Sequence, residues 1–454
     1  MLNKPLKVFW LSAEAAPLAK VGGLGDVAGS LPKALHKAGI DIRLALPYYG
    51  SIKTPAKLLL KGLRMSIAKK SIVFDVYLTT LPGTKIPVYL IKHPLFRDLE
   101  VYAKIDALKH FSLWAKASLT LITALDFIPD ILHLHDWPAA LATCFLPEFK
   151  EDYPAVFAGT KVLYTIHNLA NQGYDKKNNL NPMIEGIRRA DYINTVSPTY
   201  AREILTKKYG VRLEKILLKR RQNLVGILNG IDTDLFNPKN DSNIKYNYSV
   251  KNLVGKTKNK LALQAELGLA VDKQKPLLAF VARLSWQKGI ELFSDSLFDN
   301  LIIKYDAQFI FLGDGDSKYK KYLSKFVRKY PRNIKVFFKL DLSLAQKLYA
   351  ASDFFLMPSQ FEPCGLTQMM AMRYGSLPIV HSVGGLKDTV NSSVGYSFKN
   401  YTAVDLSKTI GKALKDFSSN PVVIQKKRQN AMKKNFSWQS AARQYFKLYQ
   451  KMVK

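Results

Sequence analysis

The strongest constraint on the fold is the way in which buried strands alternate with helical stretches. Residues 8–12 read as a buried strand, a glycine-rich turn follows at 20–25, residues 26–37 have helical spacing, and residues 42–46 read as the next strand. Further strand-like runs, each separated by enough chain for a crossover helix, lie at residues 88–91, 131–135, 162–166 and 224–228. The pattern predicts a parallel, doubly wound α/β sheet.

The same pattern restarts after a polar stretch rich in Asn and Lys at residues 237–260, which we interpret as a domain linker. The strands expected beyond it lie at residues 277–282, 308–312, 334–338, 354–358 and 377–383. We therefore predict two facing Rossmann-like domains, residues 1–236 and 237–435, with a ligand cleft between them at the carboxyl ends of the strands. The aromatic spacing of the last segment, residues 436–454, predicts a helix that returns to brace the first domain.

Composition limits the class of protein. With 454 residues, of which 48% are hydrophobic, the chain can bury full cores. Cys144 and Cys364 are the two cysteines, which excludes a disulfide framework and favours a reducing, cytoplasmic location. Glu14 and Lys20 interrupt the apolar N-terminus, and the apolar run at residues 117–125 falls well short of the roughly 20 residues that a membrane helix needs. We expect no membrane association.

The chain is strongly basic, with 68 Lys and Arg against 35 Asp and Glu and a formal charge of +33. Such an excess raises the alternative of a non-enzymatic nucleic-acid binder. The Lys residues, however, are spread along the whole chain, no RNA-binding motif is present, and charge alone supports only non-specific binding. No specific nucleic-acid partner is predicted.

Three loops after predicted strands carry residues suited to an anionic sugar substrate. The glycines after Lys20, at positions 22, 23 and 25, allow backbone amides to approach an anion at a helix N-terminus, although a plain tight turn explains them equally well. Arg283 and Lys288 leave one strand end and can converge on a diphosphate. Glu362 lies in a rigid loop before the helix that begins near Leu366, where a carboxylate can hold sugar hydroxyls.

His133 and His135 fall on the same face of a strand, and His167 and Asn168 close the next strand. A metal site is one interpretation of the first pair, but the HExxH spacing of catalytic zinc is missing. We instead expect His135 to bind a sugar hydroxyl and His133 to be a hydrogen-bonded core residue. Cys364 has apolar flanks and is interpreted as a packed small side chain.

Taken together, these loops resemble the motifs of the glycogen and starch synthases, retaining glucosyltransferases with a GT-B fold. The resemblance spans nearly the whole chain. It is carried by KVGGLGDV at residues 20–27, HDW at 135–137, HNL at 167–169, VSPTYA at 196–201, LNGID at 228–232, the RL and QKG of residues 283–289, and EPCGLTQ at 362–368, the most specific of the set.

The resemblance implies a role for each matching residue. Lys20 with the Gly22 and Gly23 amides would meet the distal phosphate of the donor, and Arg283 and Lys288 would neutralise the diphosphate leaving group. His135 would lie beside the anomeric centre, with its backbone carbonyl facing the developing oxocarbenium ion. The other implied contacts are with the donor for Glu362, Asn229, Gly365, Leu366 and Thr367, and with the acceptor for Asp26, His167 and Asn168.

The implied reaction transfers glucose from ADP-glucose or UDP-glucose to the 4-hydroxyl at the non-reducing end of an α-1,4-glucan, with retained configuration. No carboxylate nucleophile for a double displacement can be named, so front-face attack is favoured. Neither metal nor cofactor is implied. The alternative is another retaining GT-B glycosyltransferase with a different acceptor. Two features argue against it: the EPCGLTQ-like loop, and Met370 at a position where many such enzymes carry a second Glu.

Three features depart from the family pattern. Pro138 follows Trp137 where the family often has a second His, and residues 174–195 are fewer than in the usual acceptor-side segment. Leu340 stands where some members place a tyrosine against the nucleotide base. The sequence therefore leaves open the choice of nucleotide, the acceptor range and the oligomeric state.

Overall fold

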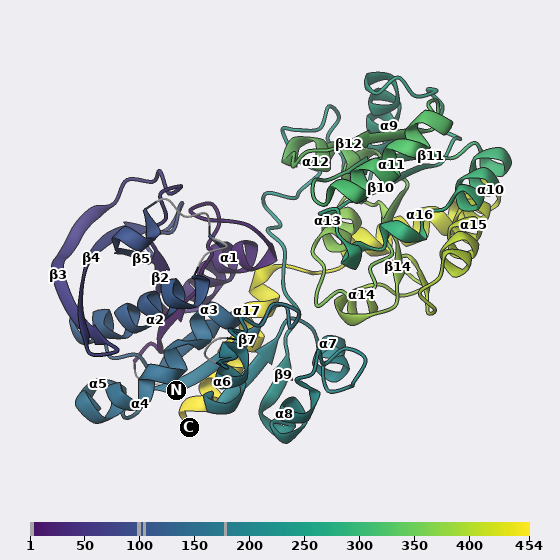
Figure 1. The fold of residues 1–454 in the computed structure, drawn as a ribbon. Helices are drawn as coiled ribbons and strands as arrows, with labels where there is room; N and C mark the ends of the chain where they lie inside the picture. The colour runs from purple at the N-terminus through teal and green to yellow at the C-terminus, as the bar shows by residue number, and fades with distance from the viewer. Residues whose placement is uncertain (1–3, 98–100, 103–105, 177–178) are drawn as a thin grey trace. The chain divides into compact units, whose positions relative to one another are not determined.

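A computed structural model describes residues 4–97, 101–102, 106–176 and 179–454. The chain divides into two compact units, one of Met1–Gly230 with Trp438–Lys454 and one of Ile231–Ser437. Each unit has a central β-sheet with helices packed against it (Figure 1). The first unit ends a few residues before the boundary expected at residues 236 and 237.

The first unit is built on a nine-stranded sheet in the order β3-β4-β5-β2-β1-β6-β7-β8-β9. Its strands are β1 (Lys7–Leu11), β2 (Asp41–Pro47), β3 (Lys57–Ile67), β4 (Lys70–Thr80), β5 (Pro87–Lys92), β6 (Ile131–His135), β7 (Lys161–Ile166), β8 (Tyr192–Thr195) and β9 (Leu224–Gly226). The central strand β1 pairs in parallel with β2 and β6, and its Phe9, Trp10 and Leu11 are fully buried. Burial of successive residues requires layers on both faces, as in doubly wound sheets.

Two long strands at one edge make this sheet mixed, which the sequence did not predict. β3 pairs antiparallel with β4, and β4 pairs antiparallel with β5. The turn between β3 and β4 consists of Ala68 and Lys69, both with positive φ of 49° and 64°. Asn and Gly are the residues that normally indicate such a two-residue hairpin turn. Because neither occupies positions 68 and 69, the sequence contained no indication of this turn.

The helices of the first unit are α1 (Gly23–Lys37), α2 (Ala107–Thr123), α3 (Asp136–Ala140), α4 (Ala142–Asp152), α5 (Pro154–Phe157), α6 (Pro182–Arg189), α7 (Pro198–Glu203), α8 (Glu214–Lys219) and the C-terminal α17 (Trp438–Val453). α17 packs against α1 (Figure 1), although α1 ends at Lys37 and α17 begins only at Trp438. Asn194 Nδ2 donates to Tyr445 Oη at 2.7 Å, and the Tyr449 hydroxyl is 2.7 Å from His133 Nδ1. The last helix is thus bonded into the core of the first unit.

The second unit contains a six-stranded sheet in the order β12-β11-β10-β13-β14-β15, and all its pairs are parallel. Its strands are β10 (Leu277–Val281), β11 (Gln308–Leu312), β12 (Ile334–Phe337), β13 (Phe354–Met357), β14 (Leu377–His381) and β15 (Tyr396–Phe398). Its helices are α9 (Val254–Glu266), α10 (Asp295–Tyr305), α11 (Ser317–Lys329), α12 (Leu342–Ala351), α13 (Thr367–Arg373), α14 (Gly384–Thr389), α15 (Ala403–Ser419) and α16 (Pro421–Lys433). Five of the six strands coincide with the expected runs to within two residues, and β15 was missed.

The polar stretch at residues 237–260 is not the linker that the sequence suggested. The Tyr374 hydroxyl donates to the buried Asp241 at 2.6 Å, and Asn243 Nδ2 donates to Gln346 Oε1 at 2.9 Å. α9 begins within the stretch at Val254. In a sequence, polar residues that make buried hydrogen bonds cannot be told from those of a linker. Here they belong to the packed second unit.

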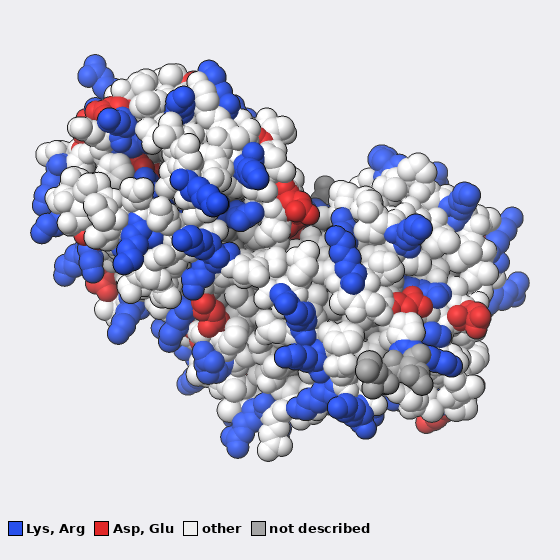
Figure 2. All heavy atoms as spheres, turned by 180° about the vertical axis from the view of Figure 1, so that it is seen from behind, with Lys and Arg blue, Asp and Glu red and all other residues white. Residues whose placement is uncertain are grey.

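On the face drawn in Figure 2, charged side chains are distributed rather than concentrated. Figure 2 shows Lys and Arg side chains scattered over the visible face, with Asp and Glu among them. Among the described residues, no helix combines the length and apolar character that a bilayer span requires.

Candidate active site

In the first unit, most of the predicted residues follow β1, β6 and β7 along the chain. Lys20 precedes Gly22, the N-cap of α1, and its Nζ lies 2.6 Å from Asp26 Oδ1 in a half-exposed ion pair. The Gly22 amide donates to the Glu14 carboxylate at 2.9 Å. The structure therefore differs from the expectation that this amide meets a phosphate, because an internal carboxylate already occupies it. Gly23 is the first residue of α1.

His135 ends β6 and is fully buried. Its ring stacks on Trp10 with the ring centroids 3.9 Å apart, and its Nδ1 is 2.9 Å from His167 Nε2. Burial, followed by the influence of His133 and His167, holds the pKa of His135 well below its usual value, so the ring is neutral. Within the described residues, His135 Nε2 is buried and has no hydrogen-bond partner, which is unusual for a buried polar atom.

His133 is a core residue, as expected. Its Nε2 lies 2.7 Å from Thr165 Oγ1 and its Nδ1 contacts Tyr449, so both ring nitrogens are used inside the fold. The described residues contain no group of three or more His, Cys, Asp or Glu placed to hold a metal ion. The geometry gives the metal interpretation of His133 and His135 no support.

Asp136 is a residue whose importance is not visible in the sequence. It starts α3 with a φ of 55°, and its half-buried carboxyl accepts hydrogen bonds from the backbone amides of His167 at 2.7 Å and Asn168 at 3.4 Å. Burial raises the pKa of Asp136 to about 7, against the lowering effect of those two amides, and the negative charge of Glu14 adds to the rise. Its side chain thus ties the end of β6 to the loop after β7.

The predicted acceptor residues His167 and Asn168 lie in that loop. Burial lowers the pKa of His167 to about 3, so this ring is neutral as well. Asn168 Oδ1 accepts from the Ala170 amide at 3.0 Å and shapes the local turn. Asn229 is near the end of the first unit, and its Oδ1 has no partner among the residues that the structure describes.

In the second unit, residues 74 positions apart form one cluster. Lys288 Nζ is 2.6 Å from Glu362 Oε2, and Ser359 Oγ donates to the same oxygen at 2.9 Å. Only 17% of the Lys288 side chain and 7% of the Glu362 side chain are exposed. Because β10 and β13 are neighbours in a parallel sheet, their carboxyl ends bring both loops to one edge. Arg283 is exposed on the loop after β10 and forms no ion pair with any described residue.

Close backbone contacts fix this cluster. Gly289 has a φ of 72°, and a Cβ there would lie 2.1 Å from the Pro358 carbonyl oxygen. A Cβ at Gly384 would lie 1.9 Å from the Glu362 carbonyl oxygen, and one at Gly385 would lie 2.1 Å from that of Cys364. The glycines at 384 and 385 therefore let α14 lie against the Glu362 loop.

The remaining donor-side residues lead into α13. Gly365 has a φ of 70°, Leu366 is the N-cap, and Thr367 begins the helix and donates from Oγ1 to Met357 Sδ at 3.3 Å. Leu340, which replaces the expected tyrosine, is 84% exposed on the loop after β12. It offers an apolar contact but no aromatic ring.

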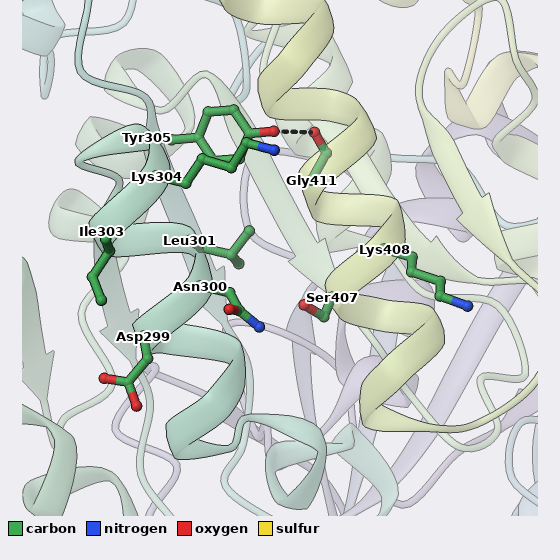
Figure 3. A pocket seen from close by; sticks show the side chains of 9 residues that line it. All are labelled: Asp299, Asn300, Leu301, Ile303, Lys304, Tyr305, Ser407, Lys408 and Gly411. Carbon is green, nitrogen blue, oxygen red and sulfur yellow. Dashed lines mark hydrogen bonds between the residues drawn. The ribbon is translucent and has the colours of Figure 1, made fainter.

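A separate hollow of about 370 Å³ lies between α10 and α15 (Figure 3). None of the predicted site residues lines it. Its walls are Asp299, Asn300, Leu301, Ile303, Lys304, Tyr305, Ser407, Lys408 and Gly411. The chemistry expected from the sequence motifs therefore does not use this hollow.

Comparisons with known proteins cover both units. The family model described as starch synthase catalytic domain matches residues 7–219, and that of glycosyl transferases group 1 matches residues 268–435. The glycogen synthase of Thermosipho melanesiensis is 39% identical over 481 residues, covering 99% of both chains. That of Streptococcus agalactiae serotype Ia is also 39% identical, covering 98% of this chain and all of its own.

Solved structures agree with these sequence comparisons. The catalytic domain of starch synthase IV from Arabidopsis thaliana, solved with ADP and acarbose, matches with a TM-score of 0.89 and 31% identity, over 99% of this chain and 100% of that one. A sucrose-phosphate synthase from Thermosynechococcus elongatus matches with a TM-score of 0.61 at 19% identity, over 98% of each chain, and shows shared fold alone.

Proposed function

Because the chain belongs to the glycogen synthase and starch synthase family of GT-B glycosyltransferases, we propose that it extends an α-1,4-glucan by transferring glucose from ADP-glucose with retained configuration. The ADP named in the Arabidopsis starch synthase structure supports an adenine nucleotide as the donor. UDP-glucose is the competing donor, since Leu340 provides no aromatic platform for either base.

The observation that carries this proposal is the pairing of Lys288 with Glu362 at the end of the second sheet, 2.6 Å apart and largely shielded from water. A sugar diphosphate needs positive charge at its phosphates and hydrogen-bond acceptors at its hydroxyls. Lys288, with the unpaired Arg283 nearby in sequence, supplies the first, and Glu362 supplies the second. The Gly365, Leu366 and Thr367 backbone at the start of α13 would contact the donor beside them.

In the first unit, we assign His135 to the glucosyl group. Its ring is neutral, its orientation is set by Trp10 and His167, and its buried Nε2 has no partner among the described residues. Lys20 would meet the distal phosphate. Asp26, His167 and Asn168 would serve the acceptor, and Asn229 the donor.

The proposed chemistry is front-face attack. Asp136 directly follows His135, but one of its carboxyl oxygens accepts from two backbone amides and its pKa is raised to about 7. These properties suit a structural acid rather than an exposed nucleophile. The departing diphosphate would then take the acceptor proton while Arg283 and Lys288 neutralise its developing charge. Protein cations fill the role that a metal has in other sugar-nucleotide enzymes, so we propose that neither metal nor cofactor is required.

A cytoplasmic location completes the proposal. Cys144 and Cys364 form no disulfide, which agrees with a reducing compartment.

The test is an incubation of the purified protein with ADP-glucose or UDP-glucose and glycogen. Release of the nucleoside diphosphate is followed together with the lengthening of outer chains, measured by iodine staining. We expect both signals with ADP-glucose. Release of nucleotide without chain lengthening would instead favour a glycosyltransferase with another acceptor.

A further inference from the structure

Glu14 is a buried acid that the proposed chemistry does not use. It follows β1 and is 2% exposed. Its Oε2 accepts hydrogen bonds from the Val21 amide at 2.7 Å and the Gly22 amide at 2.9 Å, and its Oε1 accepts from the Tyr102 hydroxyl at 2.9 Å. A buried carboxylate is costly unless such donors compensate for lost water, so three donors on one side chain indicate a built arrangement.

The contacts lie under the turn that carries Lys20. Consecutive amides such as those of Val21 and Gly22 form a concave donor pair that commonly binds an anion. Here the anion is internal. A Cβ at Gly25 would lie 3.0 Å from both Glu14 Oε2 and Lys20 Cγ, which shows that the carboxylate, the lysine stem and the first turn of α1 are in close packing.

We propose that Glu14 is a positioning residue that fixes the turn at residues 20–23, and with it the Lys20 ammonium and the start of α1, for a phosphate of the donor. This inference rests on the proposed function. Glu14 does not contact the substrate itself. Its carboxylate holds the backbone on either side of the point where Lys20 leaves the turn.

Tyr102 belongs to the same arrangement. Burial raises the pKa of its hydroxyl well above the ordinary value, and the charges of Glu14 and Asp136 raise it further, so the hydroxyl remains a donor throughout the working pH range. On the other side, Tyr49 donates to the Ala13 carbonyl at 3.0 Å and Ser12 Oγ to the Glu14 carbonyl at 2.6 Å. The position of Glu14 is therefore fixed by its own hydrogen-bond partners and neighbours.

The test compares Glu14→Ala, Glu14→Gln and Tyr102→Phe with the wild type. The amide of Gln retains one oxygen for the Val21 and Gly22 amides, whereas Ala leaves both without an acceptor. The matched control is Asp75→Asn, because Asp75 Oδ1 also accepts a glycine amide, that of Gly62 at 2.9 Å, but on the exposed edge hairpin. The readouts are ADP binding by calorimetry, donor KM and kcat, melting temperature, and amide hydrogen exchange of residues 20–25.

We expect Glu14→Ala to weaken ADP binding and raise donor KM by about tenfold or more, to change kcat less, and to speed exchange of the Val21 and Gly22 amides. Glu14→Gln should recover most of this loss, Tyr102→Phe should show a smaller effect, and Asp75→Asn should match the wild type.

The proposal is overturned if Glu14→Ala folds and leaves ADP affinity, KM and amide exchange at wild-type values, or if kcat falls while KM and exchange stay constant. Should Glu14→Ala fail to fold, Glu14→Gln and Tyr102→Phe decide through the same readouts. A wild type that binds no nucleotide would refute the proposed function, and the exchange measurement would still report whether Glu14 holds the turn.

Discussion

Lys288→Ala should remove two interactions at once. The ammonium would neutralise the departing diphosphate, and in the absence of donor it lies 2.6 Å from Glu362 Oε2. After the substitution, the Glu362 carboxylate keeps the hydrogen bond from Ser359 Oγ but loses its counter-ion. The variant therefore tests the assigned chemistry and the local electrostatics of the second unit together.

The two effects have different sizes. Loss of one group that stabilises developing negative charge typically lowers kcat by about 10²- to 10³-fold. Breaking a fully buried ion pair costs about 3–5 kcal/mol, and because 17% of the Lys288 side chain is exposed and Ser359 remains, we expect a smaller loss of about 1–3 kcal/mol here. The protein should thus stay folded while its turnover nearly disappears.

The matched control is Lys325→Ala. Lys325 also pairs with a carboxylate, Asp295, but 53% of its side chain is exposed, and its removal lowers the net charge of +33 by the same single unit. Initial rates at saturating donor and glycogen, with melting curves of all three proteins, give the comparison. Equal rates for the two variants would refute the reasoning, since they would mean that total charge and not position governs turnover.

Three further predictions concern the framework around the site. Asp353→Asn should lower the free energy of unfolding by about 3–5 kcal/mol, because the buried Asp353 carboxylate accepts from Lys260 Nζ, Arg428 Nη2 and the Leu277 amide. Chemical denaturation would measure the loss, and Asp299→Asn, at a side chain that is 42% exposed, should have a smaller effect. Gly289→Ala should lower both turnover and stability, because its Cβ would clash with the Pro358 carbonyl oxygen. Gly268 also has a positive φ, of 62°, but has open space around it, so Gly268→Ala should lower the free energy of unfolding by only about 1–2 kcal/mol and leave the kinetic constants unchanged. The pKa of Asp136 is raised from 3.8 to about 7, so between these pH values the folded protein keeps a proton that the unfolded chain releases, and the stability of the wild type declines as pH rises from about 4 to 7. Asp136→Asn lacks this proton, so its melting temperature relative to the wild type should rise over that range. A constant difference between the two melting temperatures would contradict the assignment.

What the sequence predicted well was local. A strand, a loop and a helix are encoded by neighbouring residues, so the hydrophobic pattern alone places the loops that carry His135, Arg283 and Glu362 at the ends of strands. The wrong predictions arose where the signal was weak or ambiguous. The Ala68–Lys69 turn lacks hairpin residues, and the polar stretch at residues 237–260 has the composition of a linker although its side chains make buried hydrogen bonds.

Pairings between distant residues could not be read from the sequence. Lys288 and Glu362 meet because β10 pairs with β13 as well as with β11, the next strand in sequence. This strand order follows from the packing of the whole sheet. Glu14 had looked like a charge that interrupts an apolar run. Its role depends on a turn that folds back over seven residues to place the Val21 amide on the carboxylate, and spacing alone gives no sign of such a return.

The two units hold their motif loops by different means. In the second unit, the Glu362 loop is enclosed by backbone: Gly289 lies against Pro358, Gly384 against Glu362, and Gly385 against Cys364, at distances that no Cβ tolerates. In the first unit, side-chain carboxylates do this work, with Glu14 on the Lys20 turn and Asp136 on the loop after β7. Substitutions at these three glycines of the second unit should therefore act through steric clash. Substitutions of the two first-unit carboxylates should act through lost hydrogen-bond acceptors, so that Gln or Asn preserves geometry that Ala would lose.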